Sequence, residues 1–478
     1  MTETAGMRAL LDLEDDAPDA LREQIPGAGI PLWPLARWPV SRALAEADIG
    51  TTVPTYAGKP LSHRVMSTVR RILPNPHSAR LTPRAAHLFI VSGWTKSPGP
   101  EGFVNWLSDD FARSLGEDAA VVQDAYLDLL SRGNQRPANA RTYSFTRANE
   151  RVTRQATRHP LPDRVRADLE RALRAAFAAI DHPVTEAGRE RAIADALGRA
   201  DRALQAKSAF SRLLDRVAPS RIYMQTAAYG NRAADIALAH ERGIKVAELQ
   251  HGWMGSSHAA YNLGRVMREP DLVRCLPDTM LGYGEFWGRD IRFPGRFVPV
   301  GKPTLDRTLL QTIPWAERPH RVLFVSSNYS HDLVDRTLHA LRDALPGDWS
   351  IALRPHPVER ATAAATHAGV LARDGVDLDL TSDAGAALGA SRAVVGFSST
   401  MLFEALAYGC HVAVVDSPLA DHYASVGVFP ARISADLSDA ATIASAFLVP
   451  PSAIEQQVAD SVWQPGAVAA FRAFAGSY

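Results

Sequence analysis

Cysteine is scarce in this sequence. Only two cysteines, Cys275 and Cys410, occur among the 478 residues, and they lie far apart with no metal-ligand spacing. Scarce and separated cysteines are typical of proteins in a reducing compartment, and they disfavour a disulfide framework and a zinc site.

Long apolar runs are also missing. No window approaches the roughly 18 uninterrupted apolar residues that a membrane-spanning helix needs. The first residues, from Met1 to Asp16, are acidic and have no long apolar core, so we expect no secretory signal. The sequence therefore predicts a cytoplasmic protein, which would meet a lipid-linked substrate at the inner face of the membrane.

Neither sign of charge is in excess. Lysine plus arginine and aspartate plus glutamate number 52 each, which argues against a nucleic-acid partner. One local exception, from Lys59 to Arg84, carries several basic residues and no acid, with apolar residues at near-helical spacing between them. It has two interpretations: a peripheral contact with membrane or anionic substrate, or a basic helix packed on an acidic neighbour.

The length and the order of predicted elements indicate two α/β domains with open parallel sheets. Buried strand patterns alternate with amphipathic helices in two separate sets. The predicted elements include a strand from Arg321 to Val325 and helices from Asn105 to Leu115, His331 to Ala344 and Val358 to His367. We predict an N-terminal accessory segment (1–84), a Rossmann-like domain (85–303) with a helical insertion at about 149–217, a second Rossmann-like domain (304–466), and a C-terminal helix (467–478).

Open parallel sheets bind ligands beyond the carboxyl ends of their strands, so polar residues at those positions are the first candidates. The strand Trp349 to Leu353 runs into Arg354, Pro355, His356 and Pro357. The prolines fix the backbone, while a cation followed by an imidazole can contact a phosphate and a ribose or base. A rigid turn without ligand is the alternative interpretation.

A second strand end carries three hydroxyl groups. The strand Ala393 to Val395 leads through Gly396 into Ser398, Ser399 and Thr400, which open an apolar helix. A helix N-terminus with free amides favours a phosphate, although simple capping accounts for one of the hydroxyls. One turn later, Glu404 lies on the same helix, where it can bind a ribose hydroxyl pair or an internal arginine.

The N-terminal domain supplies weaker candidates. The strand Ile244 to Leu249 ends in Gln250, His251 and Gly252, and His251 can act as an acid or base facing the cleft, or be a buried structural histidine. Glu101 is our first candidate for the catalytic base, and Asp110 is a second unless it is an ordinary early-helix acid. Lys302, which ends the last strand of this domain, would lie near a phosphate.

These motifs in this order resemble the bacterial GT-B glycosyltransferases of capsule and surface-polysaccharide synthesis. That group includes Kdo transferases, sialyl- and polysialyltransferases, and the related teichoic-acid glycerophosphotransferases. The resemblance rests on Glu248 to Gly252, Arg354 to Pro357, and Val394 to Gly409, and it covers Arg221 to Asp416. It implies a GT-B fold, with two Rossmann-like domains facing a central cleft.

By the same resemblance, His356 contacts the nucleotide, Ser398 and Ser399 contact its phosphate, and the donor is a CMP-activated sugar of Kdo or sialic-acid type. The acceptor would be a saccharide or a lipid-linked glycan, with no cofactor. Sialyltransferases of this kind carry two acids before a glycine at the base; here only Glu101 precedes Gly102. No Asp-X-Asp motif is present, so we predict metal independence. Two alternatives are a CDP-polyol phosphotransferase and a non-catalytic nucleotide-sugar-binding assembly partner.

Overall fold

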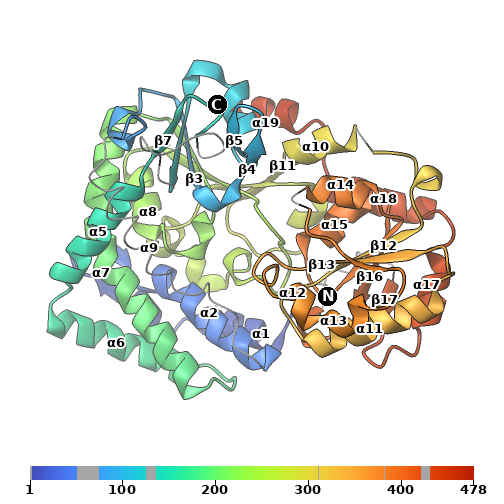
Figure 1. The fold of residues 1–478 in the computed structure, drawn as a ribbon. Helices are drawn as coiled ribbons and strands as arrows, with labels where there is room; N and C mark the ends of the chain where they lie inside the picture. The colour runs from blue at the N-terminus through green and yellow to red at the C-terminus, as the bar shows by residue number, and fades with distance from the viewer. Residues whose placement is uncertain are drawn as a thin grey trace.

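The computed structural model describes residues 3–50, 75–124, 127, 136–310, 312–381, 383–420 and 431–477. Its main strands form two separate parallel sheets, each flanked by helices (Figure 1). The prediction of an α/β protein with two Rossmann-like domains in a GT-B arrangement is therefore confirmed.

The N-terminal sheet has seven parallel strands in the order β11-β10-β9-β8-β3-β6-β7. The chain builds outward from β3 through β6 and β7, then returns to β3's other side and continues through β8 to β11. The strands are β3 (His87–Ser92), β6 (Ala119–Asp124), β7 (Thr142–Ser144), β8 (Arg221–Met224), β9 (Lys245–Leu249), β10 (Thr279–Gly282) and β11 (Arg296–Pro299).

The C-terminal sheet has six parallel strands in the order β14-β13-β12-β15-β16-β17. Its central strands are buried along their length, as expected where helices cover both faces. The strands are β12 (Arg321–Val325), β13 (Ser350–Arg354), β14 (Val376–Leu378), β15 (Ala393–Gly396), β16 (His411–Val415) and β17 (Ala431–Ile433).

Helices surround both sheets. The region predicted as a helical insertion forms three long helices, α5 (Thr146–Arg158), α6 (Asp163–Ala178) and α7 (Glu186–Val217). The other helices of the N-terminal domain are α4 (Asp109–Ser114), α8 (Ala233–Glu241) and α9 (Pro270–Val273). Around the second sheet lie α10 (Pro303–Leu309), α11 (His331–Ala344), α12 (Ala363–Thr366), α13 (Ala368–Leu371), α14 (Ala384–Gly389), α15 (Thr400–Ala407), α17 (Ala440–Ala446) and α18 (Ala453–Val462).

The last helix, α19 (Ala467–Gly476), packs on the N-terminal domain although it follows the second sheet in sequence (Figure 1). The Phe471 ring stacks on Phe111 with centroids 4.3 Å apart and lies 6.0 Å from Phe89. The chain thus returns to its first domain at the end.

The described residues 3–50 of the N-terminal segment pack around a buried ion pair. It contains α1 (Ala5–Asp16), a hairpin of β1 (Gln24–Ile25) and β2 (Ile30–Pro31), and α2 (Trp33–Ile49). The Arg37 guanidinium pairs with the Glu14 carboxylate at 2.5 Å and also donates to the carbonyls of Ala259 and Asn262. These bonds fasten both helices to the N-terminal domain. The basic stretch from Lys59 to Arg84 lies largely in 51–74, outside the described residues.

Two predicted helices are shorter than expected. In place of a helix from Asn105 to Leu115, the chain forms a hairpin of β4 (Lys96–Gly99) and β5 (Gly102–Asn105) before α4. Gly102 permits this turn, because it has a φ of 144° and a Cβ there would lie 2.5 Å from the Arg136 carbonyl. In place of a helix from Val358 to His367, turns precede the short α12.

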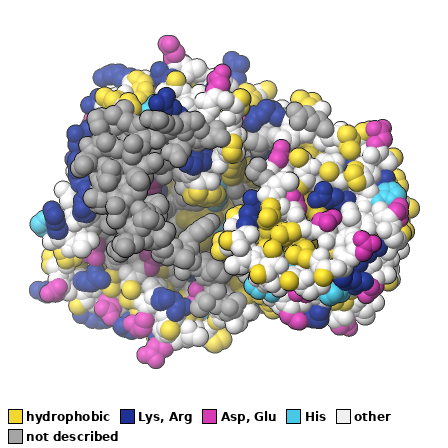
Figure 2. All heavy atoms as spheres, in the orientation of Figure 1, with side chains coloured by type: hydrophobic (Ala, Val, Ile, Leu, Met, Phe, Trp, Pro, Cys, Tyr) yellow, Lys and Arg dark blue, Asp and Glu magenta, His cyan; other side chains and the backbone are white. Residues whose placement is uncertain are grey.

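Both cysteines are buried and unpaired with each other. Among the described residues, no helix is long and apolar enough to cross a membrane. On the face shown in Figure 2, acidic and basic side chains are interspersed where side chains are coloured.

Candidate functional site

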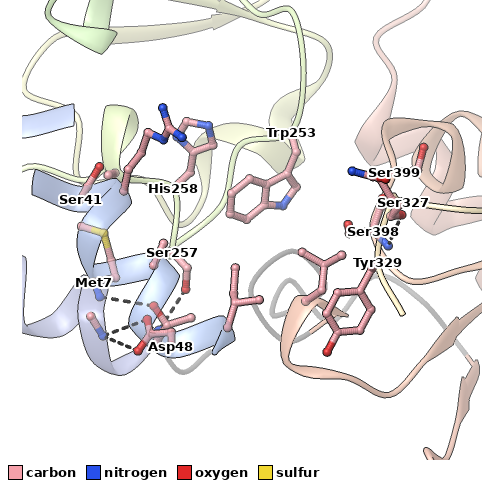
Figure 3. Close-up of a pocket in the computed structure, with 18 of the residues that line it drawn as sticks. Met7, Ser41, Asp48, Trp253, Ser257, His258, Ser327, Tyr329, Ser398 and Ser399 are labelled. Carbon is pink, nitrogen blue, oxygen red and sulfur yellow. Dashed lines mark hydrogen bonds between the residues drawn. The ribbon is translucent and has the colours of Figure 1, made fainter. Parts of the chain in front are cut away.

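A cavity of about 910 Å³ lies between the two domains. One wall comes from the C-terminal domain, and the opposite wall comes from α1, α2 and the segment after β9 (Figure 3). The C-terminal wall contains Ser326, Ser327, Asn328, Tyr329, Ser330, His331, His356, Ser398, Ser399, Thr400 and Leu419. The opposite wall contains Thr4, Gly6, Met7, Leu10, Trp38, Ser41, Arg42, Ala45, Asp48, Ile49, Gly50, Trp253, Ser257, His258 and Ala259.

The topology of the second sheet explains the position of the cavity. β12 pairs with β13 on one side and with β15 on the other, so the connections after β12 and β15 diverge to opposite sides. A crevice forms where the strand order reverses in this way, and open α/β sheets bind ligands there. The segments 326–330 and 397–400 flank this crevice and line the cavity.

Two helices begin at this crevice. Ser330 caps α11, since its hydroxyl accepts a hydrogen bond from Leu333 N at 3.3 Å. Ser399 caps α15 in the same way, accepting from Met401 N at 3.2 Å. Both helices therefore present free amides and partial positive charge at the cavity, which favours an anionic ligand.

The serines after β12 and β15 are joined. The Ser327 hydroxyl donates to the Ser398 carbonyl and accepts from Ser398 N at 3.3 Å. Within the described part of the chain, the hydroxyls of Ser398 and Thr400 have no hydrogen-bond partner. They are available to a ligand, whereas capping accounts for Ser399.

Hydrogen bonds from its backbone N–H fix the position of His356. Its N–H donates to Ser326 Oγ at 2.9 Å and to Glu359 Oε2 at 3.0 Å, while Val358 N donates to its ring Nδ1 at 3.4 Å. Burial lowers the pKa of the imidazole, so it is neutral near pH 7. Pro357 is exposed and does not line the cavity.

Arg354 forms an ion pair away from the cavity. Its buried guanidinium pairs with the Asp379 carboxylate at 2.7 Å and donates to Thr381 Oγ1 at 3.1 Å. Asp379, directly after the neighbouring strand β14, therefore binds the Arg354 guanidinium, and Arg354 does not line the cavity.

Glu404 and Lys302 are likewise engaged with each other. Their charged groups lie 2.7 Å apart, and neither residue lines the cavity. Of the two partners expected for Glu404, the structure shows an internal cation, although it is a lysine in place of an arginine.

The residues Gln250 to Gly252, directly after β9, are not part of the cavity lining. The Gln250 amide accepts from Tyr283 N at 2.7 Å and donates to the Gly252 carbonyl at 2.8 Å, so it joins backbone segments. His251 is half-buried, with Nε2 at 3.4 Å from the Tyr229 hydroxyl, and desolvation lowers its pKa to about 4. None of Gln250, His251 and Gly252 lines the cavity.

The two carboxylates predicted for catalysis lie elsewhere. Glu101 is exposed at the tip of the β4–β5 hairpin. Asp110 accepts from Arg113 at 3.2 Å and pairs with Arg307. Neither residue lines the cavity, because the β4–β5 turn places Glu101 and ion pairs with Arg113 and Arg307 hold Asp110.

Sequence reasoning missed two parts of the cavity. The segment 326–330 directly follows a predicted strand, so the strand-end rule could have identified it. The opposite wall, from α1, α2 and 253–259, follows from long-range packing and was not predicted from the sequence. Among the described residues, no group of three or more His, Cys, Asp and Glu could hold a metal ion, and metal independence stays a prediction.

Comparisons with models of protein families and with curated proteins found no match. Among solved structures, the chain is similar to a UDP-GlcNAc 2-epimerase from Neisseria meningitidis bound to UDP-GlcNAc, with 11% identity and a TM-score of 0.46 over 81% of this chain and 98% of that one. It is also similar to a UGT transferase from Siraitia grosvenorii in complex with UDP, with 11% identity and a TM-score of 0.41 over 81% and 98% of the two chains. At these values the similarities assign no activity to this chain.

Proposed function

We propose that this protein is a glycosyltransferase that binds a nucleotide-activated sugar in the cavity between its domains. The single observation behind this proposal is the convergence of two capped helix N-termini with the hydroxyls of Ser398 and Thr400 at the strand-order reversal. Neither hydroxyl has a hydrogen-bond partner among the described residues. A diphosphate or phosphodiester group needs such donors when it leaves water.

In this proposal the donor phosphate lies against the starts of α11 and α15, and His356 contacts the nucleotide. The motif resemblance supports a CMP donor carrying a Kdo- or sialic-acid-like sugar. The opposite wall faces the transferred sugar and the acceptor, which we propose is a saccharide or a lipid-linked glycan. Arg354, Glu404 and Lys302 have no direct contact with the donor in this arrangement.

The first test is a thermal-shift titration of the full chain with CMP, CDP, UDP, GDP and ADP. A ligand that binds the native state raises the apparent melting temperature by mass action. Stabilisation by CMP supports the proposed donor, whereas selective stabilisation by UDP or GDP replaces it. The absence of any shift would contradict a nucleotide-sugar function.

The placement of the donor is tested with Ser398→Ala and His356→Ala. Losing one hydrogen bond to a charged phosphate costs about 1.5–3 kcal/mol, so we expect nucleotide Kd to rise about tenfold or more. Ser445→Ala is the matched control, because its exposed hydroxyl bonds only within α17. Unchanged Kd in both variants would place the nucleotide elsewhere.

A further inference from the structure

A transferase that activates an acceptor hydroxyl needs a group to take the proton, and none of the bases expected from the sequence is in the cavity. Glu101, Asp110 and His251 all lie outside it. Among the described residues that line the cavity, Asp48 is the only acidic side chain. It lies near the end of α2, across the cavity from Ser398 and Ser399 (Figure 3).

Two other parts of the chain contact the Asp48 carboxylate. Both of its carboxylate oxygens accept from Gly6 N at 3.1 Å, in the first turn of α1. His182 Nε2, from the connection between α6 and α7, lies 3.2 Å from Oδ1. A Cβ at residue 6 would lie 2.7 Å from Oδ2, so glycine is needed for this close approach. The Asp48 side chain still retains 13% of its exposure, which leaves it accessible from the cavity.

The three histidines of the cavity are less suited to this task. His331 and His356 belong to the wall where the phosphate is proposed to lie. Both ring nitrogens of His258 are engaged, since Nδ1 accepts from Ala260 N at 3.3 Å and Nε2 lies 3.1 Å from the Tyr229 hydroxyl. Asp48 alone combines a basic oxygen with a position facing the phosphate wall.

We propose that Asp48 is the general base of the transfer reaction, and this inference rests on the proposed function. The Asp48 carboxylate takes the proton of the acceptor hydroxyl while that oxygen forms a bond to the anomeric carbon. The bond from this carbon to the phosphate oxygen breaks, and its electron pair leaves with the nucleotide. The starts of α11 and α15 stabilise the charge that develops there. His182 is a positioning residue, which pairs with the carboxylate when its imidazole is protonated.

The main test is Asp48→Asn, which keeps an oxygen for the Gly6 amide and removes the base. The assay measures the rate of nucleotide release from CMP-N-acetylneuraminic acid, with water or octyl glucoside as acceptor. UDP-GlcNAc or GDP-mannose replaces this donor if the thermal-shift titration selects UDP or GDP. We expect nucleotide Kd within twofold of wild type and a release rate at least about 100-fold lower, the usual contribution of a general base.

The matched control is Glu46→Gln on the same helix. Glu46 pairs with Arg191 at 2.6 Å and does not line the cavity, so its rate should stay within about twofold of wild type. His182→Gln leaves the carboxylate and its Gly6 contacts in place, and we expect an approximately tenfold lower rate with unchanged nucleotide Kd. It serves as the test if Asp48→Asn fails to fold.

The proposal is overturned if Asp48→Asn releases nucleotide within threefold of wild type, or if wild type binds nucleotide and releases none from any donor. A wild-type rate in His182→Gln, with Asp48→Asn unfolded, would also overturn it. Failure of the proposed function looks different, because the wild-type protein would then bind no nucleotide.

Discussion

The Lys302 ammonium lies 2.7 Å from the Glu404 carboxylate and joins the end of the N-terminal domain to α15 of the C-terminal domain. The side chains are only 13% and 16% exposed, and the ammonium lies 5.3 to 5.9 Å from the ring centroids of Trp106, Tyr283 and Trp463. Removing either partner leaves the other charge in a largely dry aromatic site.

We therefore expect Glu404→Gln to lower the free energy of unfolding by about 1–3 kcal/mol, less than the cost for a fully buried pair. Urea titration measures this change, and a cycle with Lys302→Met and the double variant isolates the coupling of the pair. If Glu404 contacted a ribose, Glu404→Gln would weaken nucleotide binding more than Lys302→Met does. We expect equal nucleotide Kd in both.

Glu359 lies under the proposed nucleotide site. Its Oε2 accepts from the Ser326 hydroxyl and from His356 N at 3.0 Å, and Oε1 lies 3.3 Å from His331 Nε2. Glu359 does not contact the ligand in this proposal, but we expect Glu359→Ala to raise nucleotide Kd about 10- to 100-fold, because Ser326 and His356 lose their hydrogen-bond acceptor. Glu359→Gln keeps an acceptor oxygen and should lose less.

Isothermal titration calorimetry measures this change in Kd. Asp374→Ala removes an exposed acid from the same domain and should bind like wild type. An unchanged Kd in Glu359→Ala would show that the loops hold their arrangement without this carboxylate.

Glu248 makes stability depend on pH. It is fully buried, and desolvation raises its pKa from 4.5 to about 7 although Ala228 N and the Tyr261 hydroxyl donate to it at 2.6 and 2.9 Å. Between pH 4.5 and about pH 7, Glu248 is protonated in the folded state but ionised in the unfolded chain. Its stabilising contribution is therefore present below pH 4.5 and is lost as pH rises through about 7.

Glu248→Gln mimics the protonated form and should remove this loss. We expect its free energy of unfolding, relative to wild type, to increase by about 2–3 kcal/mol between pH 4.5 and pH 7.5. Urea titrations at a series of pH values measure the difference. A difference independent of pH would mean that Glu248 titrates normally in the folded protein.

The buried Glu14–Arg37 pair should control the N-terminal wall of the cavity. Trp33 Nε1 and Gly264 N also donate to Glu14, each at 2.8 Å, so Arg37→Met leaves this carboxylate without its countercharge. We expect a loss of about 3–5 kcal/mol and faster proteolysis of the first helices. Arg8→Met, at an exposed position of α1, should change neither measurement.

The sequence predicted what depends on local pattern. The helix from His331 to Ala344 has its predicted bounds, and the strands ending near Leu249, Leu353 and Gly396 were predicted within a residue or two. Because parallel strands end at one edge of a sheet, His356 and Ser398 were also expected near one another, and both line the cavity.

The roles of side chains that pair with residues distant in sequence could not be predicted. Whether Arg354 is free for phosphate depends on Asp379, and whether Glu404 is free for ribose depends on Lys302. Likewise, Asp48 reaches the cavity only because Gly6 and the buried Glu14–Arg37 pair bring α1 and α2 against the sheet. Such contacts leave no periodicity or spacing in a single sequence.

The return of α19 to the first domain means that the chain crosses between the domains twice, near Lys302 and near Gln464. The two crossings lie close together, since a Cβ at Gly301 would lie 2.2 Å from the Gln464 carbonyl, and Gln464 N also donates to the Tyr283 carbonyl at 2.6 Å. Two neighbouring crossings should form a hinge, which permits the domains to open about one axis and resists a twist of one domain against the other. Spectroscopic labels on the walls of the cavity should therefore report opening, whereas labels beside these crossings should keep a constant separation.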